Sequence, residues 1–138
     1  MNIAFMAHDK RKELMVQFFI AYSGILSKHA LYSTAVTGRL VTEATGLDVT
    51  LFLSGDQGGS QQIGARVAYN EIDILIVFND PFEESTLDAE IYKIIRHCDM
   101  HNIPVATNIA TAEIIIRALD RGDLDWRNIV NPKNKGKQ

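Results

Sequence analysis

The chain has 138 residues, of which 46% are hydrophobic and 22% are charged. This composition is typical of one soluble globular domain and excludes disordered chains and small disulfide scaffolds. Lys and Arg number 14 against 17 Asp and Glu, so the formal net charge is −3. A negative net charge argues against a nucleic-acid polymer or an anionic membrane as partner.

Cys98 is the only cysteine, so an intramolecular disulfide is excluded. His97 and His101 have the spacing of two zinc ligands on a helix, but no third ligand lies near them in the sequence. We therefore assign them structural roles and expect no metal and no cofactor. The apolar runs are far shorter than the roughly 20 residues of a membrane-spanning helix, and Asp9 and Lys10 interrupt any signal-peptide core. We expect a cytoplasmic protein.

Short β-type runs alternate along the chain with longer runs of helical periodicity, which predicts an α/β fold with a parallel sheet. The expected strands are Ile3–Met6, His29–Tyr32, Val49–Leu53, Ile72–Phe78 and Ile103–Ala106. The sequence contains no internal repeat and no linker. Residues 1–130 are therefore expected to form one domain and residues 131–138 a polar tail.

Polar loops follow the predicted strands, at the sheet edge where open α/β proteins bind ligands. The second and third loops, Ser33–Gly38 and Ser54–Gln62, combine hydroxyls with glycines whose N–H groups can turn inward. Lys12 lies about one turn into the first predicted helix, within reach of the same anion. The pattern indicates a phosphate site. The alternative leaves Thr37 as a helix cap, Ser54 in a simple turn and Lys12 in solvent.

A histidine and two carboxylates follow the first and fourth predicted strands. His8, Asp9 and Asp80 would converge on one crevice, where their pKa values would shift. The alternatives are that Asp9 caps a helix, Asp80 forms an Asp-Pro turn and His8 is a hydrogen-bonded loop residue.

Six ordered blocks extend over nearly the whole chain. They are AHDKRK at 7–12, LYSTAVTG at 31–38, EATGL at 43–47, LSG at 53–55 with GGSQQIGA at 58–65, DILIVFNDP at 73–81 and IPVATNIATAE at 103–113. In these blocks the chain resembles the methylglyoxal synthases, which eliminate phosphate from dihydroxyacetone phosphate. The resemblance implies a flavodoxin-like, three-layer fold with a parallel sheet, a homohexamer and an active site near a subunit boundary.

The resemblance also implies a set of site residues. Carried over motif by motif, the phosphate ligands are Lys12, Thr34, Thr37, Gly38, Ser54 and Gly55, with Ser60 in the same loop. His8, Asp9 and Asp80 are expected beside the reacting carbons, as the catalytic candidates.

The chain departs from the family where protons are moved. The family loop reads S-G-P-x-G-G-D-Q-Q, and its Asp removes the substrate's proton, whereas this chain reads SGDQGGSQQ with Ser60 at that place. The family's carbonyl-polarising histidine falls at Leu87, and the P-D pair that follows becomes Ala89-Glu90. An arginine that the family supplies late in the chain to a neighbouring phosphate site has no clear match here, and Arg127 is the conceivable stand-in.

These departures predict impaired chemistry. A positioned base contributes roughly 10²–10⁴-fold, and a neutral hydroxyl cannot replace it. We therefore expect a relative that binds a phosphate-bearing small molecule, such as a nucleotide-like metabolite, with catalysis lost or strongly impaired, and that acts by sequestration or sensing. The alternative is an active lyase that recruits Asp9, Asp56, Asp80 or Glu90 as the base.

Overall fold

The computed structural model describes residues 1–131 and confirms the alternation of strands and helices. The strands are β1 (Asn2–Ala7), β2 (Ala30–Ser33), β3 (Val49–Leu51), β4 (Ile74–Phe78) and β5 (Val105–Ala106). The helices are α1 (Lys12–Ala21), α2 (Ser23–Leu26), α3 (Ala35–Thr45), α4 (Gly59–Ala68), α5 (Asp88–His101), α6 (Ile109–Asp120) and α7 (Arg127–Val130), with 3-10 turns η1 (Asp9–Arg11) and η2 (Gly55–Gln57).

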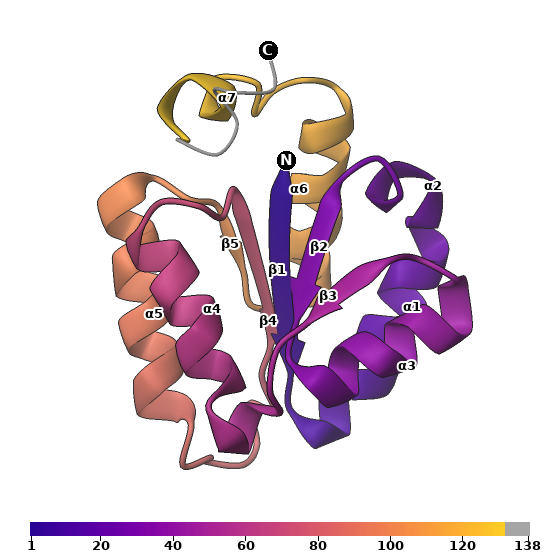
Figure 1. Ribbon diagram of the computed structural model, residues 1–138. Coiled ribbons are helices and arrows are strands. Elements are labelled where there is room, and N and C mark those ends of the chain that lie inside the picture. Colours follow the sequence, from indigo (N-terminus) through magenta and orange to yellow (C-terminus); the bar gives the residue numbers. More distant parts are fainter. Residues whose placement is uncertain (132–138) are drawn as a thin grey trace.

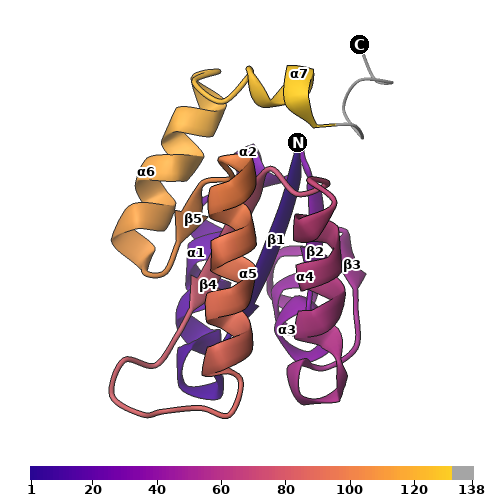
Figure 2. The same cartoon turned by 90° about the vertical axis from the view of Figure 1, so that its left-hand side faces the viewer.

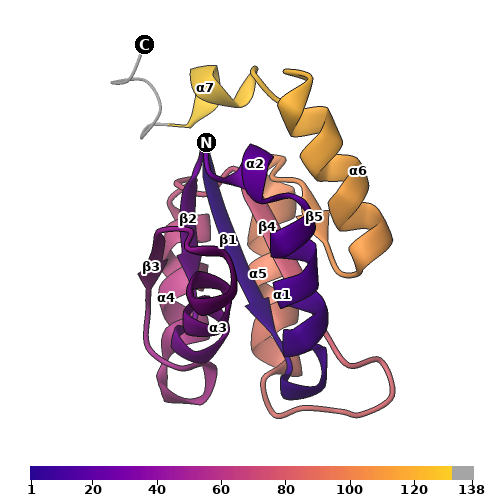
Figure 3. The ribbon, with the colours of Figure 1, turned by 90° about the vertical axis from the view of Figure 1, so that its right-hand side faces the viewer.

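The five strands form one parallel sheet in the order β3-β2-β1-β4-β5. Helices α1, α3 and α6 pack on one face, and α4 and α5 pack on the other, which confirms the three-layer, flavodoxin-like architecture (Figure 1, Figure 3). The winding direction reverses between β1 and β4. Doubly wound sheets bind ligands beyond the carboxyl ends of the strands at such a reversal.

Two strands are shorter than predicted at their beginnings. Ile72 and Ile103 are buried, but strand pairing begins only at Ile74 and Val105. The apolar runs therefore marked burial correctly, whereas hydrogen-bonded pairing covers only part of each run.

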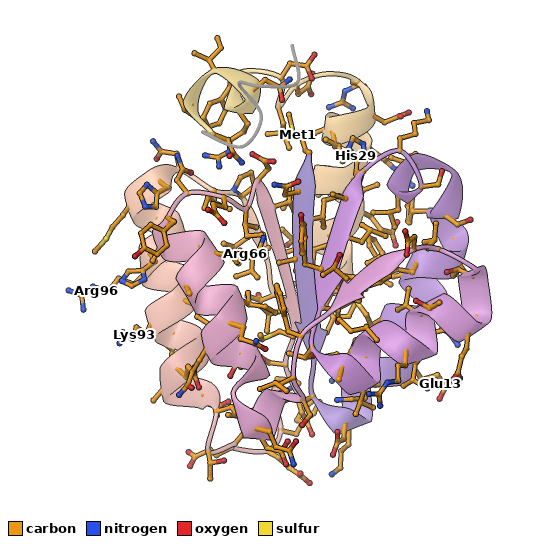
Figure 4. All side chains as sticks on the ribbon, viewed as in Figure 1. Met1, Glu13, His29, Arg66, Lys93 and Arg96 are labelled. Atoms are coloured by element: carbon orange, nitrogen blue, oxygen red, sulfur yellow. The ribbon has the colours of Figure 1, made fainter. Side chains whose placement is uncertain are left out.

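Each face of the sheet has its own apolar core. From β1, Phe5 packs against Phe19 of α1, with ring centroids 4.2 Å apart, while Met6 faces α4 and α5. On α5, Cys98 points into the core, and burial raises the pKa of its thiol to about 12. Lys93 and Arg96 extend from the outer side of the same helix, so α5 is amphipathic (Figure 4).

The end of the sheet where the strands begin is closed by α7 (Figure 1). The buried Arg127 guanidinium donates to Ile72 O at 2.8 Å and lies 3.3 Å from Asp73 Oδ1. Asn131 Nδ2 donates to the same Asp73 oxygen at 2.7 Å. Asn131 therefore belongs to the fold rather than to the predicted tail, whose residues 132–138 lie outside the described residues.

Within residues 1–131, no helix is long and apolar enough to cross a membrane. The same part of the chain holds no group of three or more His, Cys, Asp or Glu side chains arranged to bind a metal ion. His101 Nε2 donates to Ala68 O at 3.0 Å, which is the structural role expected of that histidine.

Candidate functional site

The loops after β1, β2, β3 and β4 meet at the end of the sheet opposite α7, where the loop between β4 and α5 projects (Figure 2). The N–H of Phe52 donates to Ser33 O at 2.8 Å, so the loops after β2 and β3 run side by side. The N–H of His8 donates to Phe78 O at 3.0 Å, which continues the pairing of β1 with β4 into the loops that follow.

These loops enclose a cavity of about 580 Å³. All predicted site residues except Gly38 line it: His8, Asp9, Lys12, Thr34, Thr37, Ser54, Gly55, Ser60 and Asp80. Met6, Val77, Leu87 and Ile91 form an apolar part of the lining, and the charged residues Lys10, Asp56, Glu83 and Glu84 also line the cavity. The structure therefore brings the predicted polar residues together and adds an apolar side.

Gly38 has a packing role instead of a place on the cavity wall. A Cβ at this position would lie 2.3 Å from Leu51 Cδ2 and 3.1 Å from Ser33 Cβ, so glycine allows α3 to pack closely on β2 and β3. The Gly38 N–H already donates to Thr34 O at 3.0 Å. Packing, not contact with phosphate, explains this glycine.

The first turn of α3 offers hydrogen-bond donors at the cavity. The N–H groups of Val36 and Thr37 belong to this turn, where a helix has no carbonyl to receive them, and both residues line the cavity. The buried Thr37 hydroxyl has no hydrogen-bond partner within residues 1–131. Since α3 begins at Ala35, Thr37 is not its cap. Buried hydroxyls are normally paired, so this orphan indicates a missing partner.

Lys12 is held at the cavity rather than extended into solvent. Its Nζ donates to Ala7 O at 2.7 Å and lies 3.0 Å from Asp9 Oδ1, and its side chain is 17% exposed. Through a side-chain hydrogen bond to Asp9 and through its charge, Lys12 holds the pKa of Asp9 below the usual value. Asp9 makes no capping hydrogen bond, and its side chain is 97% exposed. A lowered pKa makes Asp9 a weaker base.

The His8 ring is fixed by the loop between β4 and α5. The Asp80 N–H donates to His8 Nδ1 at 3.0 Å, so a neutral ring carries its hydrogen on Nε2. Asp80 Oδ1 accepts from Phe82 N at 2.9 Å, which is the predicted Asp-Pro turn. Asp88 Oδ1 lies 3.7 Å from His8 Nε2. Sequence reasoning missed Asp88, whose one signal is its place directly after Leu87.

A family model described as the MGS-like domain matches residues 15–107. The chain is 62% identical to a methylglyoxal synthase of Caldicellulosiruptor saccharolyticus, over 96% of this chain and 94% of that protein. It is 53% identical to a methylglyoxal synthase of Alkaliphilus metalliredigens, over 96% and 99% of the two chains. The crystal structure of methylglyoxal synthase from Elizabethkingia anophelis matches with a TM-score of 0.78 at 40% identity, covering 83% of this chain and 76% of that one.

The chain belongs to the methylglyoxal synthase family. Ser60, which the sequence motif predicts at the place of the family's base, is buried in the first turn of α4, and its hydroxyl donates to Gly55 O at 3.3 Å. Within residues 1–131 no ionisable side chain is hydrogen-bonded to it, so nothing raises its affinity for a proton. Gly59 before it must be glycine, because a Cβ there would lie 1.9 Å from Leu53 O.

Leu87, which the sequence motif predicts at the place of a family histidine, lies on the cavity wall beside the turn at Gly55. Its Cδ1 is 3.5 Å from the position that a Cβ on Gly55 would take. A leucine offers no donor to a carbonyl oxygen. Among the described residues, His8 is therefore the one imidazole that lines the cavity.

The four candidate replacement carboxylates differ in position. Asp9, Asp56 and Asp80 line the cavity, whereas Glu90 does not. Asp9 is paired with Lys12, and Asp80 accepts a backbone hydrogen bond in its turn. Asp56 is exposed in η2 and makes no hydrogen bond or ion pair within residues 1–131. Among the three candidates that line the cavity, Asp56 is the least constrained.

Arg127 does not serve the predicted role. Its side chain is fully buried beside Asp73 at the far end of the sheet, with its nitrogens bonded to protein oxygens. A buried guanidinium that is already paired cannot reach a phosphate in a neighbouring subunit, so the prediction for Arg127 is wrong.

Proposed function

We propose that this chain binds a small phosphate-bearing molecule in the cavity, with dihydroxyacetone phosphate as the first candidate. We further propose that it converts this molecule to methylglyoxal and phosphate far more slowly than relatives with the usual base. The observation that carries the proposal is that Thr37 lines the cavity and that its buried hydroxyl has no partner within residues 1–131.

The groups around Thr37 favour a phosphate. The free N–H groups of the first turn of α3 and the positive end of its dipole attract an anion. Lys12 adds a cation to the lining of the same cavity, and the Ser54–Gly55 turn adds a hydroxyl. Together these groups suit an oxygen-rich dianion better than a neutral ligand.

The slow turnover follows from Ser60 and Leu87, which line the same cavity. Ser60 lacks the proton affinity of a carboxylate, which accounts for roughly 10²–10⁴-fold in rate. Leu87 provides no donor to the developing enediolate, and a lost donor of that kind costs about 10²–10³-fold. Ligand binding needs neither group.

The test combines titration calorimetry with an assay for methylglyoxal and released phosphate, both with dihydroxyacetone phosphate. The unmodified chain should bind the ligand and release almost no product, and the double variant Ser60→Asp, Leu87→His should gain turnover by at least about 10²-fold. Nucleoside monophosphates belong in the same titration, because a cavity of about 580 Å³ exceeds the needs of a triose phosphate. Absence of binding to every phosphate tried would refute the proposal.

The second candidate is an active lyase that uses Asp56 as its base. The 62% identity to a named methylglyoxal synthase and the position of Asp56 on the cavity wall favour it. In that case the unmodified chain turns over dihydroxyacetone phosphate, and Asp56→Asn abolishes the reaction while leaving ligand affinity within about twofold.

A homohexamer is part of the proposal, and exposed apolar side chains support self-association. Val36 and Leu40 on α3 and Leu51 and Leu53 around edge strand β3 are exposed, and Val36 also lines the cavity. Light scattering coupled to size exclusion should give six times the 15.4 kDa of one chain. A monomer would contradict this part.

A further inference from the structure

The loop between β4 and α5 forms one wall of the cavity, and His8 contacts both ends of that loop. Residues 83–87 of the loop line the cavity. At the start of the loop, the Asp80 N–H donates to His8 Nδ1. At its end, Asp88 Oδ1 lies 3.7 Å from His8 Nε2. One imidazole therefore lies between two loop positions that are eight residues apart.

The second of these contacts is incomplete. His8 Nε2 is buried and has no hydrogen-bond partner within residues 1–131, although the hydrogen on Nε2 needs an acceptor. A separation of 3.7 Å is too long for a hydrogen bond, and a movement of well under 1 Å would form one. The carboxylate is already oriented, because its other oxygen accepts from Ser85 N at 2.9 Å.

Asp88 acts on the cavity only through His8. It lines an adjacent hollow of about 750 Å³ and is not among the residues that line the cavity itself. We propose that Asp88 is a positioning residue: a hydrogen bond from His8 Nε2–H to Asp88 Oδ1 completes the closure of the loop when the cavity holds its phosphate ligand. This inference rests on the proposed function, because it takes that ligand to be what draws the loop inward.

The proposal fixes the chemistry available to His8. With Nδ1 occupied by the Asp80 N–H and Nε2–H directed to Asp88, the ring has no free lone pair with which to accept a proton. His8 therefore holds the cavity wall and does not act as the missing base. Carboxylates that accept the second N–H of an imidazole fix ring orientation in the same way in other sites.

The test uses Asp88→Ser, which keeps a side-chain oxygen for the Ser85 N–H at the start of α5 but places none near Nε2. Asp99→Ser, on the exposed side of the same helix, is the matched control. The dissociation constant for dihydroxyacetone phosphate should rise about tenfold in Asp88→Ser and stay unchanged in Asp99→Ser. The double variant His8→Asn, Asp88→Ser should bind dihydroxyacetone phosphate no more weakly than the weaker of the two single variants, because the two side chains act as one unit.

Long-range ¹H–¹⁵N spectra of labelled protein, recorded without and with ligand, test whether His8 Nε2 carries the hydrogen that the bond to Asp88 requires. His8, assigned by its absence from the His8→Asn spectrum, should show a bare Nδ1 and a protonated Nε2. On addition of dihydroxyacetone phosphate, a protected Nε2–H signal should appear, and Asp88→Ser should remove it. A proton on Nδ1, or an unchanged affinity in Asp88→Ser, would overturn the inference. If no phosphate binds the unmodified chain, the proposed function fails, whereas a ligand-free ring protonated on Nδ1 would overturn this inference by itself, because His8 Nε2 would then have no hydrogen to donate to Asp88.

Discussion

Replacing Thr37 by valine should affect stability and binding in opposite directions. A buried hydroxyl without a partner costs about 1–3 kcal/mol, and valine has nearly the same shape without the polar atom. The free Thr37→Val protein should therefore be more stable by about 1 kcal/mol, which raises Tm by about 3 °C for a domain of this size. The bound phosphate loses a charge-assisted hydrogen bond of about 1.5–3 kcal/mol, so Kd should rise by about 10- to 150-fold.

Thermal unfolding without ligand and calorimetric titration with dihydroxyacetone phosphate measure the two effects separately. Thr45→Val on the same helix is the control, because the Thr45 hydroxyl donates to Val41 O at 2.6 Å and accepts from Leu47 N at 3.1 Å. Loss of those bonds should lower stability by about 1 kcal/mol and leave Kd unchanged. A Thr37→Val protein that is less stable and binds as well as the unmodified chain would refute the reasoning.

Three further predictions concern the scaffold. Arg127→Met removes the cation beside the buried Asp73 carboxylate and should cost about 3–5 kcal/mol in urea unfolding with Kd unchanged, and loss of binding in the folded variant would contradict the account. Gly59→Ala should lower Tm sharply, because its Cβ would overlap Leu53 O. Gly24→Ala is the control and should be neutral or stabilising, because no atom lies within 4 Å of its Cβ. Equal changes of Tm in the two variants would show that the close approach of Gly59 to Leu53 is unimportant. Burial raises the pKa of Cys98 from 9.0 to about 12, so its contribution to stability is complete below pH 9 and decreases between pH 9 and about 12. The urea midpoint of unfolding should therefore fall less steeply with pH over that range in Cys98→Ala than in the unmodified chain. An equal pH dependence in the two proteins would count against this reasoning.

Much of the site could be predicted because parallel strands all end at one edge of a sheet. The loops carrying His8, Thr37, Ser54 and Asp80 are far apart in the sequence, yet topology places them around one cavity. The ordered motif also predicts that Ser60 occupies the place of the family's base, and this stays a prediction.

Features that depend on burial or on the path of a loop were not predictable in the same way. Arg127 has the charge expected of a phosphate ligand, and only the packing of α7 shows that this charge is buried beside Asp73. The contact of Asp88 with His8 spans 80 positions and depends on how the loop after β4 returns to the sheet. Gly38 occurs in a phosphate-type motif, but the proximity of Leu51 determines its role.

A crystal structure of the unmodified protein with dihydroxyacetone phosphate is the most direct measurement of the central claim. The account predicts intact ligand, with its phosphate within hydrogen-bond distance of the Thr37 hydroxyl and the N–H groups of the first turn of α3. A phosphate bound away from Thr37, or a cavity that contains only reaction products, would contradict it.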